Sequence, residues 1–185
     1  MMRSGGPCLF SIDNIKFESC TENGDVMGFV MDTYLKKVIV KSGVTRIVLI
    51  ISLVDESSPN SPIIYQLWDD LVRKYQRLVV RGAFLFISNF TRLKSREGEI
   101  IVRGGELSIF FGANLQGLLE SPQYNSLYPV EQQTLTQLID YIKATHFAPL
   151  IRYSQYILPL YYKPIYMFKY LCYVLEDMNQ SNHQF

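Results

Sequence analysis

The chain has 185 residues, of which 48% are hydrophobic and 19% are charged, and its formal net charge is +1 at pH 7. This composition is too apolar for general disorder, suffices for a well-buried core, and gives the whole molecule no strong electrostatic bias. Three widely spaced cysteines without a CxxC pair indicate free thiols in a reducing compartment rather than a disulfide framework.

Strands are predicted in the first half of the chain, after an N-terminal extension formed by residues 1–24. Apolar, β-rich runs separated by polar breaks occupy residues 26–34, 45–54, 63–68, 83–93 and 99–111. Gly104 and Gly105 interrupt the last run, which predicts a bulge or a sharp bend there. Between the first two runs, a basic stretch ends in Ser42-Gly43, which is a turn signal.

A short helix is predicted over residues 69–78, between the third and fourth strands. Its apolar residues recur at the spacing of one helical face, two aspartates open it, and its basic residues follow. The order is therefore strand, strand, strand, helix, strand, strand. Residues 25–112 then have the layout of a five-stranded oligonucleotide/oligosaccharide-binding (OB) barrel, and another five-stranded α+β domain is the alternative. The predicted fold class is mainly β with C-terminal helices.

Three stretches carry a resemblance to a known group, namely SLVDES at 52–57, YQLWDDLVRKYQRL at 65–78 and RGAFLFISNFTRL at 81–93. They resemble the OB domains of the replication protein A large subunit and its relatives. That group includes the protection-of-telomeres proteins and their shelterin partners. The resemblance extends over about residues 25–111, and its motifs are loose and mostly structural. It implies the barrel fold and a nuclear protein that works in telomere maintenance, replication or repair.

The character of the sequence changes beyond the predicted barrel. Residues 113–128 are rich in loop-forming residues and form a predicted linker, and residues 129–185 form a predicted C-terminal helical extension. A helix is expected over residues 131–147, because its apolar side chains repeat at helical spacing after a first-turn proline. Residues 153–178 hold seven of the thirteen tyrosines.

Membrane and catalytic functions find little support in the sequence. The apolar segment 156–178 contains Lys163 and Lys169, so it is a poor candidate for a membrane span, and a soluble intracellular protein is predicted. The two histidines, His146 and His183, have no Cys or carboxylate partner at a recognisable spacing. We therefore expect a protein that is not an enzyme and has neither a cofactor nor a metal site.

Basic side chains concentrate in residues 33–103, which contain twelve Lys or Arg and six Asp or Glu. In an OB barrel, the ligand lies across strands two and three, between the loops that join strands one to two and four to five. These loops are expected at residues 35–44 and 94–98. Their cations would meet phosphates, and aromatic faces would stack on bases, at about 1–3 kcal/mol per base. The candidate nucleic-acid-binding residues are Tyr34, Lys36, Lys37, Lys41, Arg46, Tyr65, Arg92, Lys94 and Arg96.

Two aromatic residues of the third strand and its end are ambiguous. Tyr65 has the same parity as Ile63 and Leu67, and whether this row points inward or outward is open at this point. Trp68 stands at the junction between strand and helix and is interpreted as a core residue.

Two functions of different classes follow from these observations. The first is a non-catalytic accessory subunit of a complex that handles single-stranded DNA, with direct contact to that DNA through the basic cleft. The second is a purely protein-binding adaptor of the shelterin kind, for example one that recruits telomerase. Both include other subunits as partners, and tyrosine and methionine are enriched in the core of protein interfaces. A helix packed on the barrel would use the same residue types in the core, and this alternative is open at this point. The candidate protein-binding residues are Tyr156, Leu160, Tyr161, Tyr162, Tyr166, Met167 and Tyr170.

Overall fold

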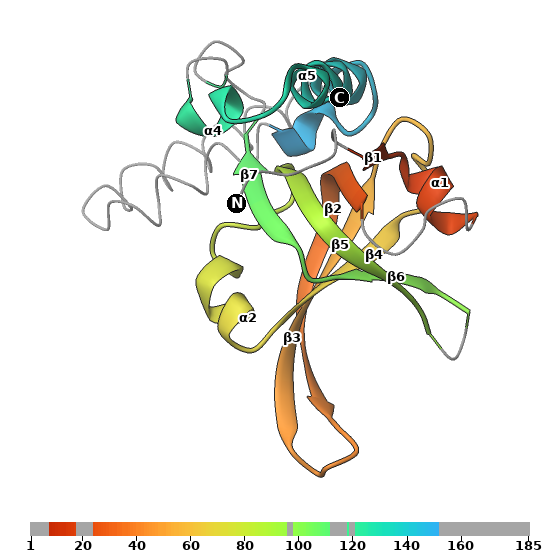
Figure 1. Cartoon of the computed structure of the whole chain (residues 1–185), viewed down its shortest axis with the longest axis vertical. Helices are drawn as coiled ribbons and strands as arrows, with labels where there is room; N and C mark the ends of the chain where they lie inside the picture. The colour runs from red at the N-terminus through yellow and green to blue at the C-terminus, as the bar shows by residue number, and fades with distance from the viewer. Residues whose placement is uncertain (1–7, 18–23, 96–97, 112–117, 119–120, 152–185) are drawn as a thin grey trace, which may run out of the picture.

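The computed structural model describes residues 8–17, 24–95, 98–111, 118 and 121–151 (Figure 1). Its fold is mostly β, with a single seven-stranded sheet and a few helices. The strands are β1 (Leu9–Phe10), β2 (Gly24–Ile39), β3 (Thr45–Val54), β4 (Ile63–Trp68), β5 (Phe84–Lys94), β6 (Ile100–Arg103) and β7 (Glu106–Phe110).

The sheet bends round so that β2 has a pairing partner on both sides. The strand order is β1-β2-β3-β4-β6-β5-β7, and β2 also pairs with β5. The pairings between β2, β3, β4, β6 and β5 therefore return to the strand where they began. All of these pairings are antiparallel except the parallel pairing of β4 with β6.

The predicted number of five strands is wrong, because the last predicted strand is divided in two and a further short strand precedes the first. Gly104 and Gly105 adopt φ values of 69° and 81°, which divide the predicted strand 99–111 into β6 and β7. A Cβ atom at Gly105 would lie 2.4 Å from the backbone oxygen of Ser88, so the close approach of β5 also requires glycine there. The other extra strand is the short β1, which pairs in parallel with β2.

The helices are α1 (Ile12–Lys16), α2 (Asp70–Tyr75), α4 (Pro122–Asn125) and α5 (Pro129–Lys143). The predicted helix between the third and fourth long strands is confirmed as α2, although it is shorter than expected. The predicted C-terminal helix corresponds to α5, which begins with Pro129 in its first turn. Among these described helices, none combines the length and the hydropathy that a membrane crossing requires.

Residues 8–17 pair with the sheet through β1 and contribute buried side chains through α1. Ile12 and Ile15 of α1 are fully buried and belong to the core that the five-strand circuit encloses. The same core contains Ile63, Tyr65 and Leu67, because alternate residues of β4 point to the same side.

A second core lies between the sheet and α5. Phe29, Phe84 and Phe110 of the sheet are grouped there with buried residues of α5, which are Leu135, Leu138, Ile139 and Ile142. The rings of Phe29 and Phe84 have centroids 5.2 Å apart, a distance typical of favourable aromatic pairs. The helix is thus packed on the sheet through these buried side chains.

Candidate nucleic-acid interface

The β2–β3 hairpin is longer than the sequence predicted. Its two strands stay paired as far as Ile39 and Thr45, so the connecting loop comprises only residues 40–44. The loop is closed by a hydrogen bond from the Val40 N–H to the Val44 oxygen, at 3.0 Å. We call residues 33–47 the arm; Figure 1 shows it projecting from the rest of the sheet. The expected loop 35–44 is therefore wrong at its start, because Lys36 and Lys37 lie on β2 and pair with β3.

Strand register divides the side chains of the arm between two faces. Tyr34 lies opposite Ile50, and Lys36 lies opposite Val48. Across the next pair of strands, Ile50 lies opposite Gln66 and Val48 lies opposite Trp68. Because directly paired residues share a face, these residues form two rows on the side of the sheet that points away from Tyr65 and the enclosed core. We call this side the outer face.

Trp68 stands on the outer face, and two guanidinium groups lie over its ring. The Cζ atoms of Arg46 and Arg103 lie 5.2 and 5.0 Å from the centre of its ring, within the range of cation–π attraction. The Arg103 Nε donates a hydrogen bond of 2.8 Å to the Gln66 side-chain oxygen. Within the described residues, the Trp68 ring nitrogen is buried and has no hydrogen-bond partner. We call Arg46, Gln66, Trp68 and Arg103 the Trp68 cluster.

Positive charge in the Trp68 cluster is only partly compensated. Partial burial lowers the pKa of Arg103, and the nearby charge of Arg46 lowers it further. The Arg46 side chain donates a 2.6 Å hydrogen bond to the Asp69 carboxylate and forms an ion pair with it, whereas Arg103 donates to the neutral amide of Gln66. An anion placed between the two guanidinium groups would relieve this repulsion.

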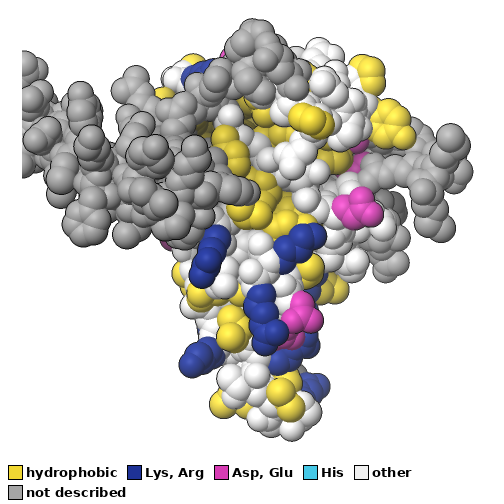
Figure 2. All heavy atoms as spheres, turned by 90° about the vertical axis from the view of Figure 1, so that its left-hand side faces the viewer, with side chains coloured by type: hydrophobic (Ala, Val, Ile, Leu, Met, Phe, Trp, Pro, Cys, Tyr) yellow, Lys and Arg dark blue, Asp and Glu magenta, His cyan; other side chains and the backbone are white. Residues whose placement is uncertain are grey.

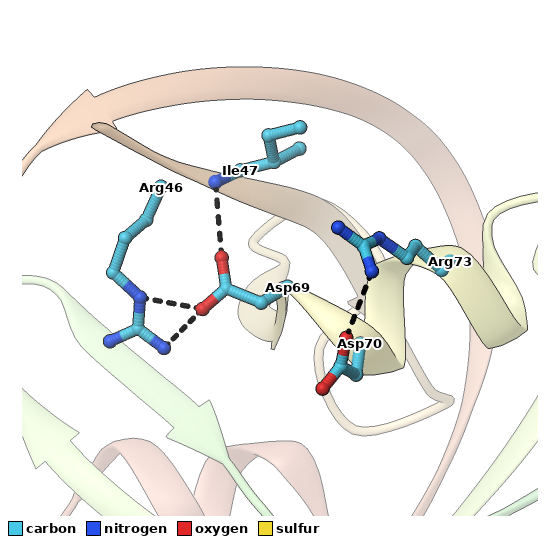
Figure 3. A network of polar contacts seen from close by, with 5 residues as sticks. All are labelled: Arg46, Ile47, Asp69, Asp70 and Arg73. Carbon is cyan, nitrogen blue, oxygen red and sulfur yellow. Dashed lines mark hydrogen bonds and ion pairs between the residues drawn. The ribbon is translucent and has the colours of Figure 1, made fainter. Parts of the chain in front are cut away.

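Asp69 is held in an unusual conformation that directs it toward Arg46 (Figure 3). Its φ of 47° is in the left-handed region, and its side chain makes no capping hydrogen bond to α2, which begins at the next residue. Instead, its carboxylate accepts a hydrogen bond from the Ile47 N–H at 3.3 Å as well as from Arg46. The hydrogen bond from Arg46 is the main cause that lowers the pKa of Asp69. The contact between Asp70 and Arg73, 3.4 Å long and exposed, contributes little.

Basic residues of the arm are open to solvent. Lys36, Lys37 and Lys41 are exposed, and Tyr34 beside them is 50% exposed. Figure 2 shows Lys and Arg side chains gathered over the lower part of the molecule, where the arm projects, with hydrophobic side chains among them. The structure therefore places five predicted residues on the arm. Tyr34, Lys36 and Arg46 share the outer face with Trp68, Lys41 lies in the connecting loop, and Lys37 lies on the opposite face.

Tyr65 is a correction to the predicted site. Its side chain is 1% exposed, and its hydroxyl donates a 3.1 Å hydrogen bond to the Gly104 oxygen. Burial raises the pKa of this hydroxyl. The inward parity of β4 thus makes its ring inaccessible to a base. Trp68 has the opposite parity and is partly exposed, so its interpretation as a core residue is also wrong.

The second predicted loop lies apart from the arm. Arg92 donates hydrogen bonds from Nε to the Ile15 oxygen at 2.6 Å and from a terminal nitrogen to the Lys16 oxygen at 3.3 Å. It thereby joins β5 to the end of α1. Lys94 is exposed at the end of β5, and Figure 1 shows the β5–β6 hairpin pointing away from the sheet in a different direction from the arm. The remaining predicted residues, Arg96 and the C-terminal set at 156–170, lie outside the described residues.

Sequence reasoning missed Gln66 and Arg103 as site residues. A usable signal was the parity of each strand, since Ile64, Gln66 and Trp68 alternate with three apolar residues that belong in a core. Arg103 is one residue from the buried Val102, which places it outward in the same way.

Comparisons with known proteins support the fold. No protein-family model matches the sequence, and a search of curated proteins gives no match. A chain from the structure of a replication protein A heterotrimer bound to ssDNA matches 74% of this chain and 28% of its own length, with a TM-score of 0.52 and 13% identity. The chain shares an OB-like fold with the replication protein A group. The resemblance inferred from the sequence is thus confirmed.

Two further matches are to smaller structures of the same kind. The second OB-fold domain of replication protein A from Methanococcus maripaludis matches 47% of this chain and 82% of its own length, at 18% identity and a TM-score of 0.37. Schizosaccharomyces pombe Pot1pC bound to ssDNA matches 64% of this chain and 91% of its own length, at 13% identity and a TM-score of 0.36.

Proposed function

We propose that the chain is a non-catalytic OB-fold subunit that binds single-stranded DNA across the outer face of β2, β3 and β4. In this proposal, the circuit of five paired strands is an OB barrel, and β2 to β4 are its first three strands. The observation that carries the proposal is the pair of guanidinium groups, Arg46 and Arg103, over the Trp68 ring, in a cluster whose positive charge is only partly compensated.

The Trp68 cluster supplies the chemistry that a nucleic-acid strand requires. Arg103, already bonded to Gln66 through Nε, keeps other guanidinium nitrogens for a phosphate. Arg46 contacts Asp69 through Nε and Nη2, and it offers Nη1 for the same role. Tyr34 offers a half-exposed ring on the same face for a base, and Lys36 lies in the neighbouring row. The contacts are to phosphates and base faces, so we expect modest sequence preference and strong salt dependence.

Binding to a labelled oligonucleotide tests this function. We suggest fluorescence anisotropy with a fluorescein-labelled oligo(dT) of about 15 nucleotides, a length that exceeds most OB binding sites. Affinity is expected to fall at least tenfold between about 50 and 200 mM salt if three or more phosphates are contacted. Absence of binding at the lower salt concentration would contradict the proposal and favour the purely protein-binding adaptor.

A matched pair of charge-removing variants locates the interface. Arg103→Ala should weaken oligo(dT) binding by about 1–2 kcal/mol, because it removes a charge-assisted hydrogen bond to phosphate. Lys143→Ala removes the same charge from the exposed last turn of α5 and should leave binding unchanged. Equal losses in the two variants would show that only general charge matters.

The proposal includes a setting for this activity. We place the chain in the nucleus, as an accessory subunit of a complex in telomere maintenance, replication or repair. The OB-like fold supports this, as does the likeness to a chain from a heterotrimer, although that protein is much longer than the matched part. Affinity purification of the full chain from nuclear extract, with and without nuclease, tests the setting. Partners that remain after nuclease treatment would be held by protein contacts rather than through nucleic acid.

A further inference from the structure

The arm has a second face that the proposed DNA contact does not use. Leu35 lies opposite Leu49, Lys37 opposite Ile47, and Ile39 opposite Thr45, so all six side chains point to the same side. This side is the reverse of the outer face that carries Tyr34 and Lys36. We call the residues Leu35, Lys37, Ile39, Thr45 and Ile47 the inner face of the arm.

The inner face continues the core row of β3 into solvent. Leu49 belongs to the enclosed core and is 3% exposed, whereas the side chains of Leu35, Ile39 and Ile47 are 54%, 73% and 43% exposed. The three exposed aliphatic residues lie on two paired strands, with Leu35 and Ile39 diagonally across from Ile47. Single exposed aliphatic residues are ordinary, but a contiguous group on a regular surface is typical of a contact with another molecule.

The arm itself carries charge of one sign, and Lys37 is the charged member of its inner face. Between Asp32 and Asp55 the chain contains four basic residues and no acidic one. Among the described residues, Lys36, Lys37 and Lys41 take part in no ion pair. The surface that would contact the inner face should therefore combine aliphatic side chains with carboxylates.

Three other occupants fit these observations less well. A nucleic-acid strand would find no aromatic ring on the inner face, and bases stack on aromatic rings rather than on Leu or Ile. A second copy of the chain would place the lysines of one arm against those of the other, and lysines on exposed strands disfavour such pairing. A membrane would have to accept the polar tip Lys41-Ser42-Gly43 before it reached the aliphatic row.

We propose that the inner face of the arm docks an acidic, aliphatic segment of a partner protein. The site is separate from the outer face, so one arm would hold DNA on one side and a protein on the other. This inference does not depend on the DNA-binding function, since a different set of residues carries it.

The test uses the full chain and a synthetic peptide of about ten residues, the length of a long strand, in which Glu alternates with Val or Leu. Control peptides replace Glu by Lys, or Val and Leu by Ser. The double variant Leu35→Thr with Ile39→Thr keeps strand propensity and removes apolar surface. Val130→Thr is the matched control, because Val130 is 48% exposed on α5. Peptide binding is measured by anisotropy, alongside oligo(dT) binding and sedimentation with anionic phospholipid vesicles.

The proposal expects the acidic peptide alone to bind, with a loss of roughly tenfold or more in the double variant. Val130→Thr should bind the peptide normally, and oligo(dT) binding should be the same in all three proteins. The inference is overturned if the double variant binds the peptide as well as the wild type, or if no peptide binds. It is also overturned if the double variant loses oligo(dT) or vesicle binding instead, since the inner face would then serve DNA or lipid.

Discussion

The Asp55 carboxylate accepts a 2.7 Å hydrogen bond from the backbone N–H of Ile12, the first residue of α1. Asp55 directly follows β3, so this bond joins two segments that are 43 residues apart. The other carboxylate oxygen accepts from the Ser57 and Ser58 backbone N–H groups, both at 3.0 Å, and from the Ser57 hydroxyl at 2.6 Å. The acidic residue at the end of β3 therefore serves as the anchor of the N-terminal segment.

Asp55→Ala should destabilise the fold by about 3 kcal/mol, because it leaves several donors, two of them buried, without an acceptor. Urea denaturation followed by circular dichroism measures this change. Glu56→Ala is the control, because the Glu56 carboxylate is next to Asp55 in the sequence but is exposed. This substitution should change the free energy of unfolding by no more than about 0.5 kcal/mol. Similar midpoints for the two variants would contradict the anchoring role.

Gly82 and Gly43 provide a pair of substitutions that separates backbone strain from steric clash. Both have positive φ values, 87° and 79°. A Cβ atom at Gly82 would lie 1.9 Å from the Leu150 oxygen, whereas a Cβ atom at Gly43 would have no other atom of the described residues within 4 Å. Gly43→Ala should lower the free energy of unfolding by about 1–2 kcal/mol, because alanine disfavours the left-handed conformation. Gly82→Ala should cost clearly more, because the segment after α5 must move away from β5. Phe147 and Ile151 are buried together with residues of the sheet. Thermal unfolding of the two variants tests whether residues 147–151 are packed against Gly82.

The succession of long strands along the chain and the place of α2 could be predicted from the sequence, because they depend on local patterns. Alternating apolar residues and the polar breaks at Asp55 and Asp69 mark the ends of β3 and β4 within one residue. The two-residue β1 and the five-residue α1 are too short to produce a periodic pattern, so residues 8–17 were assigned to an extension. Their place in the fold depends on Asp55, which no local pattern reveals.

The candidate site was less predictable because it depends on contacts between distant segments. Lys36 and Lys37 resemble loop residues by composition, and only pairing with Val48 and Ile47 makes them part of a strand. Arg103 meets Trp68 because β4 and β6 pair in parallel, a relationship between strands that lie more than 30 residues apart in the sequence. Sequence periodicity places each residue on a face but does not show which faces become neighbours.

Acidification should weaken the link between Arg46 and Asp69. The hydrogen bond from Arg46 lowers the pKa of Asp69 below its ordinary value of 3.8. A carboxyl whose pKa is lower in the folded state stabilises that state fully above the unfolded-state pKa, and this contribution is lost as the pH falls through the folded-state value. The urea midpoint should therefore fall less between about pH 6 and pH 3 in Asp69→Asn than in the wild type.

Asparagine suits this comparison because it tolerates the positive φ of Asp69 better than most other non-glycine residues do. Asp70→Asn is the control, because the Asp70 carboxylate is next to Asp69 in the sequence and its ion pair is with the exposed Arg73. If the Asp70 variant were the one with the flatter pH profile, the assignment of this ion pair would be wrong.

Trp68 is the only tryptophan of the chain, so its fluorescence reports directly on the proposed interface. Two guanidinium groups about 5 Å from its ring should concentrate anions there, and iodide should therefore quench the emission more strongly than caesium does. Arg103→Ala should reduce the advantage of iodide, whereas Lys143→Ala should not. Addition of oligo(dT) should change the emission with the same midpoint as the anisotropy titration, because the strand would cover the Trp68 cluster. Binding of the oligonucleotide without any change in Trp68 emission or in iodide quenching would place the DNA on another face.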